Sequence, residues 1–192
     1  SLDELGVPDV VYDFIKKTQG LLLLTGPTGH GKSTTLAALI DHINHNRQEH
    51  IVTIEDPVEY LHHSDQCLIE QREIGKDALD FGSALTACFR EDVDVVLVGE
   101  MRDLETISTA ITAAETGHLI LGTLHTNDSV QTVDRIIDVF PAYQQNQIRF
   151  QLANVLLGVV SQRLLKKIGG GRVPAVEVLI KNRAVENLIR QN

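Results

Sequence analysis

Short uninterrupted runs of apolar residues alternate along this chain with longer stretches in which apolar residues recur every three or four positions. Such short runs are typical of strands that are buried on both faces of a parallel sheet. Four of them predict strands: LLLL (21–24), IVTI (51–54), DVVLV (94–98) and LILGT (119–123). Strands that alternate with helices indicate an α/β fold with a parallel sheet.

The longer stretches predict the helices between these strands. In STTLAALIDHINHN (33–46), the apolar side chains at 36, 39, 40 and 43 fall on one helical face. DFGSALTACFRED (80–92) also reads as a helix, and LETISTAITAAE (104–115) is helical by its alanines and spacing. The stretch between IVTI and residue 80 reads as irregular.

The last third of the chain predicts three helices and one further strand. Asn127 or Asp128 can cap a helix that ends before Pro141. Residues 145–167 predict one long amphipathic helix ended by GGG (169–171), with apolar positions at Ile148, Leu152, Val155, Val159 and Leu164. RVPAVEVLI (172–180) alternates like a strand, and its Pro174 favours a sheet edge. AVENLIRQN (184–192) predicts a short final helix.

Composition narrows the class of protein. A chain of 192 residues with 43% apolar residues fits one domain. Its net charge of −9 argues against non-specific binding to nucleic acid or anionic lipid, although a local basic pocket stays allowed. No apolar run approaches the roughly 20 residues that span a bilayer, so no membrane insertion is expected. Cys67 and Cys88 form no CxxC pair, which favours reduced thiols in a cytosolic protein over a disulfide framework or tetracysteine zinc site.

The segment GPTGHGKS (26–33) matches the phosphate-binding pattern G-x-x-x-x-G-K-[ST], and it lies between a predicted strand and a predicted helix. Backbone N–H groups of such a loop face the phosphates, and the helix N-terminus adds a positive dipole end. Lys32 would reach the β- and γ-phosphates, and Ser33 would place its hydroxyl on Mg²⁺. The predicted ligands are therefore ATP and Mg²⁺. The predicted binding residues are Gly26, Pro27, Thr28, Gly29, His30, Gly31, Lys32, Ser33 and Thr34, with the His30 side chain itself expected in solvent.

Acidic residues follow two of the predicted strands. Glu55 ends the strand 51–54 and Glu100 follows the strand 94–98, so both should face the phosphate loop at the carboxyl edge of the sheet. The position before Glu100, where such strands usually offer an aspartate, is Gly99. Glu100 is therefore expected to act on the Mg²⁺ side through water, with Asp56 as a further candidate ligand. A carboxylate of EDPVE (55–59), Glu55 or Glu59, is left to orient or deprotonate the attacking water.

Two histidines flank the strand 119–123. Seven residues of extended chain separate His118 from His125 by up to roughly 23 Å, so they cannot both touch one γ-phosphate. His125, at the carboxyl end, is the expected sensor of the γ-phosphate. His118 is expected at the other end, in a structural role or in a subunit contact.

Four segments together resemble the family of secretion and pilus motor ATPases. GPTGHGKST, TIEDPVEY, VLVGEMRDLET and TGHLILGTLHTND are similar to its Walker A, aspartate, Walker B and histidine boxes, in the same order. The likeness covers roughly residues 2–191. The resemblance implies a RecA-like P-loop NTPase domain, with a mostly parallel twisted sheet covered by helices on both faces.

Within this family the chain most resembles the pilus retraction branch, through residues 113–141, LLKKIGGGRVPAVEVLI and AVENLIRQ. The last segment departs from the branch's usual AIRNLIRE at Glu186 and Gln191. The zinc insert that assembly and type II secretion relatives commonly carry is absent. The resemblance implies a cytoplasmic homohexamer with ATP at its subunit interfaces, which lies at the inner membrane through the pilus machine and acts on an inner-membrane platform protein.

The resemblance also implies that a PAS-like domain precedes this chain. Residues 1–20 are then expected to be an interdomain linker with a first helix, and residues 21–192 the motor domain. The family's arginine fingers lie largely in that preceding domain. Arg72, Arg90 and Arg102 are local candidates for interface or sensor roles, and each could equally form a surface ion pair. Slow hydrolysis by this chain alone is expected, because a finger supplied in trans contributes about 10³–10⁵ in rate.

Three alternatives stay open at this point. The first is a pilus assembly or type II secretion ATPase of the same family, which shares all four boxes. The second is a nucleotide-gated regulatory module that signals by occupancy. The third, a RecA-type protein that handles DNA, is disfavoured by the acidic balance of the chain.

Overall fold

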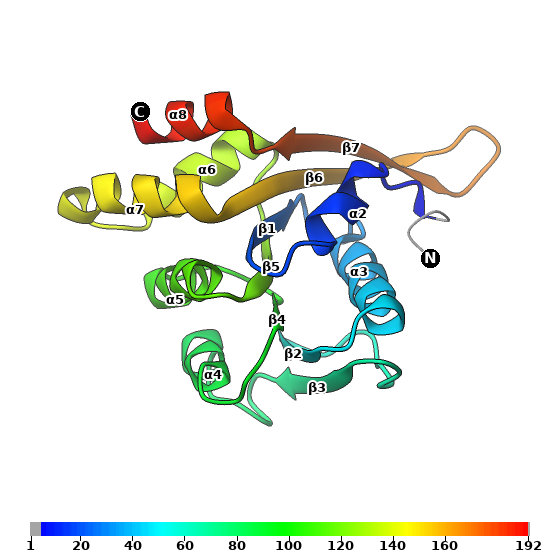
Figure 1. Cartoon of the computed structure of the whole chain (residues 1–192). Coiled ribbons are helices and arrows are strands. Elements are labelled where there is room, and N and C mark those ends of the chain that lie inside the picture. The colour runs from blue at the N-terminus through cyan, green and yellow to red at the C-terminus, as the bar shows by residue number, and fades with distance from the viewer. Residues whose placement is uncertain (1–4, 192) are drawn as a thin grey trace.

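The computed structural model describes residues 5–191, which form a seven-stranded sheet with helices on both faces (Figure 1). The strands lie in the order β3-β2-β4-β5-β1-β6-β7. Their bounds are β1 Gly20–Thr25, β2 His50–Glu55, β3 Leu68–Glu73, β4 Val95–Val98, β5 Leu119–Leu124, β6 Leu156–Lys166 and β7 Arg172–Ile180. All neighbouring pairs are parallel except β6 and β7, which are antiparallel. The predicted α/β fold is confirmed.

Two hydrophobic clusters hold the helices to the two faces of this sheet. α2 and α3 contribute apolar side chains to one cluster, and α4 to α8 contribute to the other, as the two layers in Figure 1 show. The helices are α2 Val10–Ile15, α3 Lys32–Asn46, α4 Phe81–Cys88, α5 Leu104–Glu115, α6 Ser129–Asp138, α7 Ala142–Val155 and α8 Arg183–Gln191. Asp128 caps α6 by accepting a 2.8 Å bond from the Gln131 N–H, so one of the two proposed caps is confirmed.

The prediction of one long helix over 145–167 is wrong. α7 ends at Val155, and the chain continues directly as β6, which lies between β1 and β7. Val155 and Val159 fall four residues apart, but residues 155–160 contain Gly158 and otherwise only apolar residues, three of which are β-branched valines. Burial on both sheet faces outweighs the accidental helical spacing. The glycines at 169–171, all at positive φ, form the turn between β6 and β7 instead of a helix end.

The stretch predicted to be irregular contains β3, which pairs in parallel with β2 at the edge of the sheet. Its sequence LIEQRE carries four polar residues in six, because an edge strand is buried only in part. The strand prediction for 172–180 is confirmed, and Pro174 lies on the other edge strand, β7.

The segment before β1 packs onto the domain. Val11, Phe14 and Ile15 of α2 are buried in the same cluster as the α3 core residues. Residues 1–4 of the expected linker and Asn192 at the end of the expected motor domain lie outside the described residues. Across residues 5–191, no helix combines the length and the apolar character needed to cross a membrane.

Candidate functional site

The phosphate loop connects β1 to α3 and lies against β6. Gly26 has a φ of +140°, and a Cβ added to it would stand 2.2 Å from the backbone oxygen of Gln162. Only glycine fits this close approach. Gly31, with a φ of +84°, precedes α3, so the first N–H groups of the helix open toward the loop. The sequence-predicted strand–loop–helix context is confirmed.

Lys32 is the first residue of α3 and is only 8% exposed. Its ammonium donates to the backbone oxygens of Gly26 at 2.7 Å and Pro27 at 3.1 Å, and lies 3.5 Å from His125 Nδ1. Burial lowers the pKa of Lys32, and the carboxylates of Glu100 and Glu59 oppose that shift. The loop thus holds one buried cation at its mouth, with two acids near it.

Glu100 lies just beyond β4 and joins several parts of the site. Its carboxylate is 3.0 Å from His125 Nε2 and accepts a hydrogen bond from the Arg102 guanidinium. Gly99 precedes it because β4 crosses close to β2 here: an added Cβ would stand 3.0 Å from the backbone oxygen of Ile54. An aspartate side chain would crowd the β2 backbone at this position, so the acid stands one residue later.

The acids of the 55–59 segment lie at the end of β2, on the same edge of the sheet. Glu55 is half-buried, and its Oε1 accepts bonds from the Thr53 hydroxyl at 2.7 Å and the Gln71 amide at 3.3 Å. Asp56 and Glu59 are exposed. Glu55 is therefore held by two donors, whereas the other two acids face solvent.

One cleft of about 420 Å³ collects these groups at the carboxyl edge of the sheet. The predicted site residues that line it are Thr28, Gly29, Gly31, Lys32, Ser33, Thr34, Glu55, Asp56, Glu59, Glu100, Arg102 and His125. Thr28 Oγ1 lies 3.5 Å from His125 Nδ1, which ties the loop after β5 to the phosphate loop. The structure therefore brings together most of the residues that the sequence assigned to one site, but Gly26, Pro27 and His30 do not line the cleft.

The cleft also includes residues that the sequence analysis missed. Tyr60 and His62 reach it from the segment after the acids, and Leu164 and Arg172 reach it from the β6–β7 hairpin. Burial lowers the pKa of His62, against the opposing effect of the Glu55 and Asp41 carboxylates. Tyr60 directly follows the EDPVE pattern, which is a signal that could have found it. The hairpin residues had no such signal: Leu164 was read as part of a helix, and Arg172 as the start of a strand with no link to the cleft.

Gln162 of β6 was also not predicted from the sequence. It supports the phosphate loop from the side opposite the cleft. Its buried amide accepts a 2.8 Å bond from the Thr35 hydroxyl and donates a 3.0 Å bond to the backbone oxygen of His30. The expectation that the His30 side chain lies in solvent is wrong. Its Nδ1 accepts a 3.0 Å bond from the Leu164 N–H, because β6 passes directly beneath the loop.

Three of the other candidates, His118, Arg72 and Arg90, lie away from the cleft. His118, before β5, donates from Nδ1 to the Ala113 backbone oxygen at 3.0 Å and lies against the Phe89 ring. Arg72 pairs with Glu70 at 3.1 Å and with Glu91, and these bonds raise its pKa. Arg90 is exposed on the turn after α4. Only Arg102 of the three arginines lines the cleft, and its side chain is 75% exposed.

The donor set suits a hard divalent cation held partly by phosphate. Within residues 5–191, no group of three or more His, Cys, Asp or Glu side chains is arranged to hold a metal ion. Mg²⁺ needs no such cage, because it keeps several waters and binds through one or two protein oxygens plus substrate phosphates. Ser33, Asp56 and Glu100 offer oxygens around the same cleft, so these residues fit the ion.

Comparison with known proteins gives one consistent result. A model of the family described as Type II/IV secretion system protein matches residues 5–189. The chain is 53% identical over 192 residues to the type IV pilus retractation ATPase PilT of Pseudomonas aeruginosa, and 54% identical over 193 residues to a twitching motility protein of Neisseria gonorrhoeae. These alignments cover 100% of this chain but 56% and 52% of the relatives, so the chain spans about half the length of the curated relatives it matches.

A solved structure agrees with the sequence relatives. The crystal structure of the pilus retraction motor PilT with bound ADP matches this fold with a TM-score of 0.98 at 55% identity. The match covers 100% of this chain and 56% of that one.

Proposed function

The chain belongs to the Type II/IV secretion system protein family, and on that premise we propose that it is the ATP-hydrolysing motor domain of a pilus retraction machine. Two observations support this proposal: the identity of 53–54% to proteins named for pilus retraction and twitching motility, and the shape of the cleft. The observation that carries it is the meeting of Lys32, Glu100 and His125 beside a phosphate loop at the carboxyl edge of the sheet.

The phosphate loop, residues 26–34, is the proposed ATP-binding element. Its N–H groups and the start of α3 provide donors and a positive dipole end for a polyphosphate. Lys32 supplies the charge for the β- and γ-phosphates. His125 lies within 3.5 Å of the Lys32 ammonium and 3.0 Å of Glu100, and we assign it the γ-phosphate contact for that reason.

The acids of the cleft are proposed to bind the metal and to activate the attacking water. Glu100 contacts His125 and Arg102 beside the phosphate loop, and for that reason we assign it to the side of the metal and the attacking water. Glu55 or Glu59 would orient that water or accept its proton. Ser33, with Glu100 through water and Asp56, would hold Mg²⁺. The ion would neutralise charge on the phosphate oxygens during hydrolysis.

We further propose that the working form is a homohexamer in which a neighbouring copy or a preceding PAS-like domain completes the site. Arg72 is engaged by Glu70 and Glu91, and Arg102 by Glu100, while Arg90 is exposed and does not line the cleft. A cation supplied in trans would then be needed for fast turnover, which makes this chain alone a slow ATPase. The motor would work in the cytoplasm against a platform protein of the inner membrane.

Glu100→Gln tests the proposal, because the amide keeps the size of the side chain while removing its charge. We expect ATP affinity to change by less than about threefold while single-turnover hydrolysis falls by roughly a hundredfold or more. Cells that carry the substitution should keep pili on their surface but lose twitching. Glu115→Gln, at the far end of α5, is the matched control. Loss of ATP binding with normal turnover in the bound fraction would overturn the assignment, and loss of fibres instead of twitching would favour an assembly motor.

A further inference from the structure

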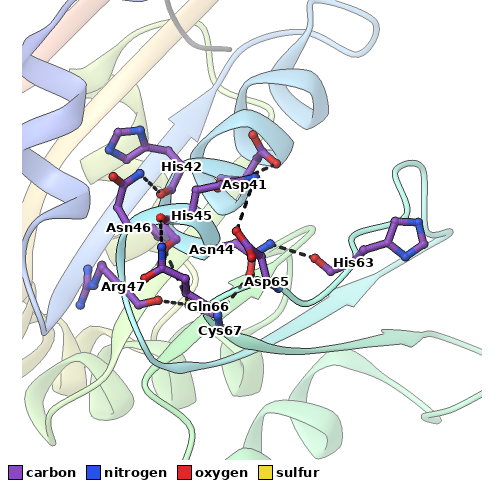
Figure 2. A network of polar contacts seen from close by, with 11 residues as sticks. Asp41, His42, Asn44, His45, Asn46, Arg47, His63, Asp65, Gln66 and Cys67 are labelled. Atoms are coloured by element: carbon purple, nitrogen blue, oxygen red, sulfur yellow. Dashed lines mark hydrogen bonds and ion pairs between the residues drawn. The ribbon is translucent and has the colours of Figure 1, made fainter.

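The acidic segment 55–59 continues into a returning segment, residues 60–67, which leads the chain back to the edge strand β3. The returning segment has no strand or helix of its own, yet Tyr60 and His62 line the cleft. Side chains of two neighbouring elements take up its backbone hydrogen bonds. Figure 2 shows one of them, Asn44, on α3 beside His63 and Asp65.

Asn44 lies near the end of α3 and is only 3% exposed. Its Nδ2 donates to the backbone oxygen of His63 at 2.9 Å, and its Oδ1 accepts from the N–H groups of Asp65 at 3.0 Å and Cys67 at 3.3 Å. Its own backbone oxygen accepts from the Gln66 N–H at 3.1 Å. One buried amide thus binds three residues of the returning segment to the helix that begins at Lys32 (Figure 2).

Gln71 of β3 fixes the other half of the returning segment. Its Nε2 donates to the Tyr60 backbone oxygen at 2.8 Å and to Glu55 Oε1 at 3.3 Å, and its Oε1 accepts from the His62 N–H at 2.8 Å. Glu59 lies between these attachment points in the sequence. The Tyr60 hydroxyl completes the arrangement, 2.8 Å from Thr34 Oγ1 in the phosphate loop.

These contacts indicate that phosphate binding and the support of the acidic segment depend on different residues. Lys32 and Ser33, at the start of α3, are the groups proposed to hold the phosphates. Neither Asn44 nor Gln71 lines the cleft. Asn44 lies about 18 Å from Lys32 along the helix, at 1.5 Å per residue. Both amides bond the backbone that follows the acids, and Gln71 also bonds the Glu55 side chain.

We propose that Asn44 and Gln71 are positioning residues that hold the acidic segment against the phosphate loop, so that they govern ATP turnover and leave ATP binding nearly unchanged. The inference rests on the proposed function, because it takes the acids of residues 55–59 to act on the attacking water. A misplacement of about 1 Å costs up to about a hundredfold in rate when a reacting group must be held in line.

The test compares Gln71→Leu and Asn44→Ala with the wild-type chain. For Gln71→Leu we expect single-turnover hydrolysis of Mg-ATP to fall roughly tenfold or more, with Kd for ATP changed by less than about threefold. Asn44→Ala should lower the rate by a smaller factor, because Gln71 still holds residues 60–62. Hydrogen exchange of the amides at 58–63 should become faster in both variants, while exchange in β1 and β5 stays unchanged.

Asn46→Ala is the control, because its side chain bonds only to the backbone oxygen of His42 within the same helix. This variant should match the wild type in rate, affinity and exchange. The proposal is overturned if both test variants hydrolyse ATP at the wild-type rate, or if rate and affinity fall together in proportion to a loss of stability. A wild-type chain that binds but never hydrolyses ATP would contradict the proposed function. Exchange at 58–63 would then decide this inference alone: faster exchange in both variants supports it, and unchanged exchange rejects it.

Discussion

The two ends of the parallel sheet carry the same kinds of side chain in different surroundings. At the carboxyl end, His125 faces Glu100 and the Lys32 ammonium, and Arg102 contacts the same acid. At the amino end, His118 bonds a backbone oxygen and lies against a phenylalanine ring. The loops after β1, β2, β4 and β5 meet at one edge only, because parallel strands all end there. Position relative to the strand end, and not residue type, decides which histidine faces the cleft.

Of the substitutions considered, Lys32→Ala at the carboxyl end should cause the largest loss of ATP affinity. The phosphates would lose their charge partner, so we expect ATP affinity to fall by about a hundredfold, or about 3 kcal/mol. Isothermal titration with Mg-ATP measures this change. The unfolding free energy should change little, because charging this buried ammonium already has a desolvation cost. Wild-type affinity in the variant would mean that the carboxyl edge is not the nucleotide site.

Gln162→Leu should have an intermediate effect, because it loosens the back of the phosphate loop without touching the cleft. The Thr35 hydroxyl and the His30 backbone oxygen would lose buried partners, so unfolding free energy should fall by about 2 kcal/mol. ATP affinity should fall by about tenfold, because a less ordered loop must be fixed on binding. Urea unfolding and titration measure the two effects, with exposed Gln131→Leu as control. A stability loss with unchanged affinity would show that β6 supports the fold but not the loop.

Substitution of His125 or His118 should have the smallest effects on nucleotide affinity and stability. The pair compares the two ends of the sheet most directly, because the residue type is the same. We expect His125→Ala to reduce the preference for ATP over ADP by about fivefold, since one charge-assisted contact to the γ-phosphate is lost. His118→Ala should lower the unfolding free energy by about 1 kcal/mol and leave both nucleotide affinities unchanged. Parallel titrations and urea unfolding of the two variants separate these results. Altered nucleotide affinity in His118→Ala would break the contrast between the two ends.

Sequence patterns identified the inner strands β1, β2, β4 and β5 because complete burial leaves an unmistakable apolar run. They failed at β3 and β6, although the other edge strand, β7, was predicted. β3 is mostly polar, since an edge strand has one partner only, and the chance spacing of Val155 in α7 and Val159 in β6 imitates one continuous helix. Local periodicity reports neither the partial burial of β3 nor the point at which the chain changes from α7 to β6.

The residues of the candidate site also fall into those that a local sequence pattern predicts and those that it does not. Lys32, Ser33, Glu55 and Glu100 belong to short local patterns, so spacing alone found them and strand order explains why they meet. Gln162, Gln71 and Asn44 belong to no pattern. Each is an ordinary amide whose importance comes from the backbone groups that the topology brings to it, so only three-dimensional neighbours could identify it.

The bond between Gln162 and the His30 backbone oxygen joins residues that are 132 positions apart. A ribosome making this protein therefore releases the glycine-rich loop long before the strand that supports it. Contacts of such long sequence separation form late and slowly in folding. The cradle for phosphate therefore becomes complete only after the ribosome has added the 132 residues that lead from His30 to Gln162.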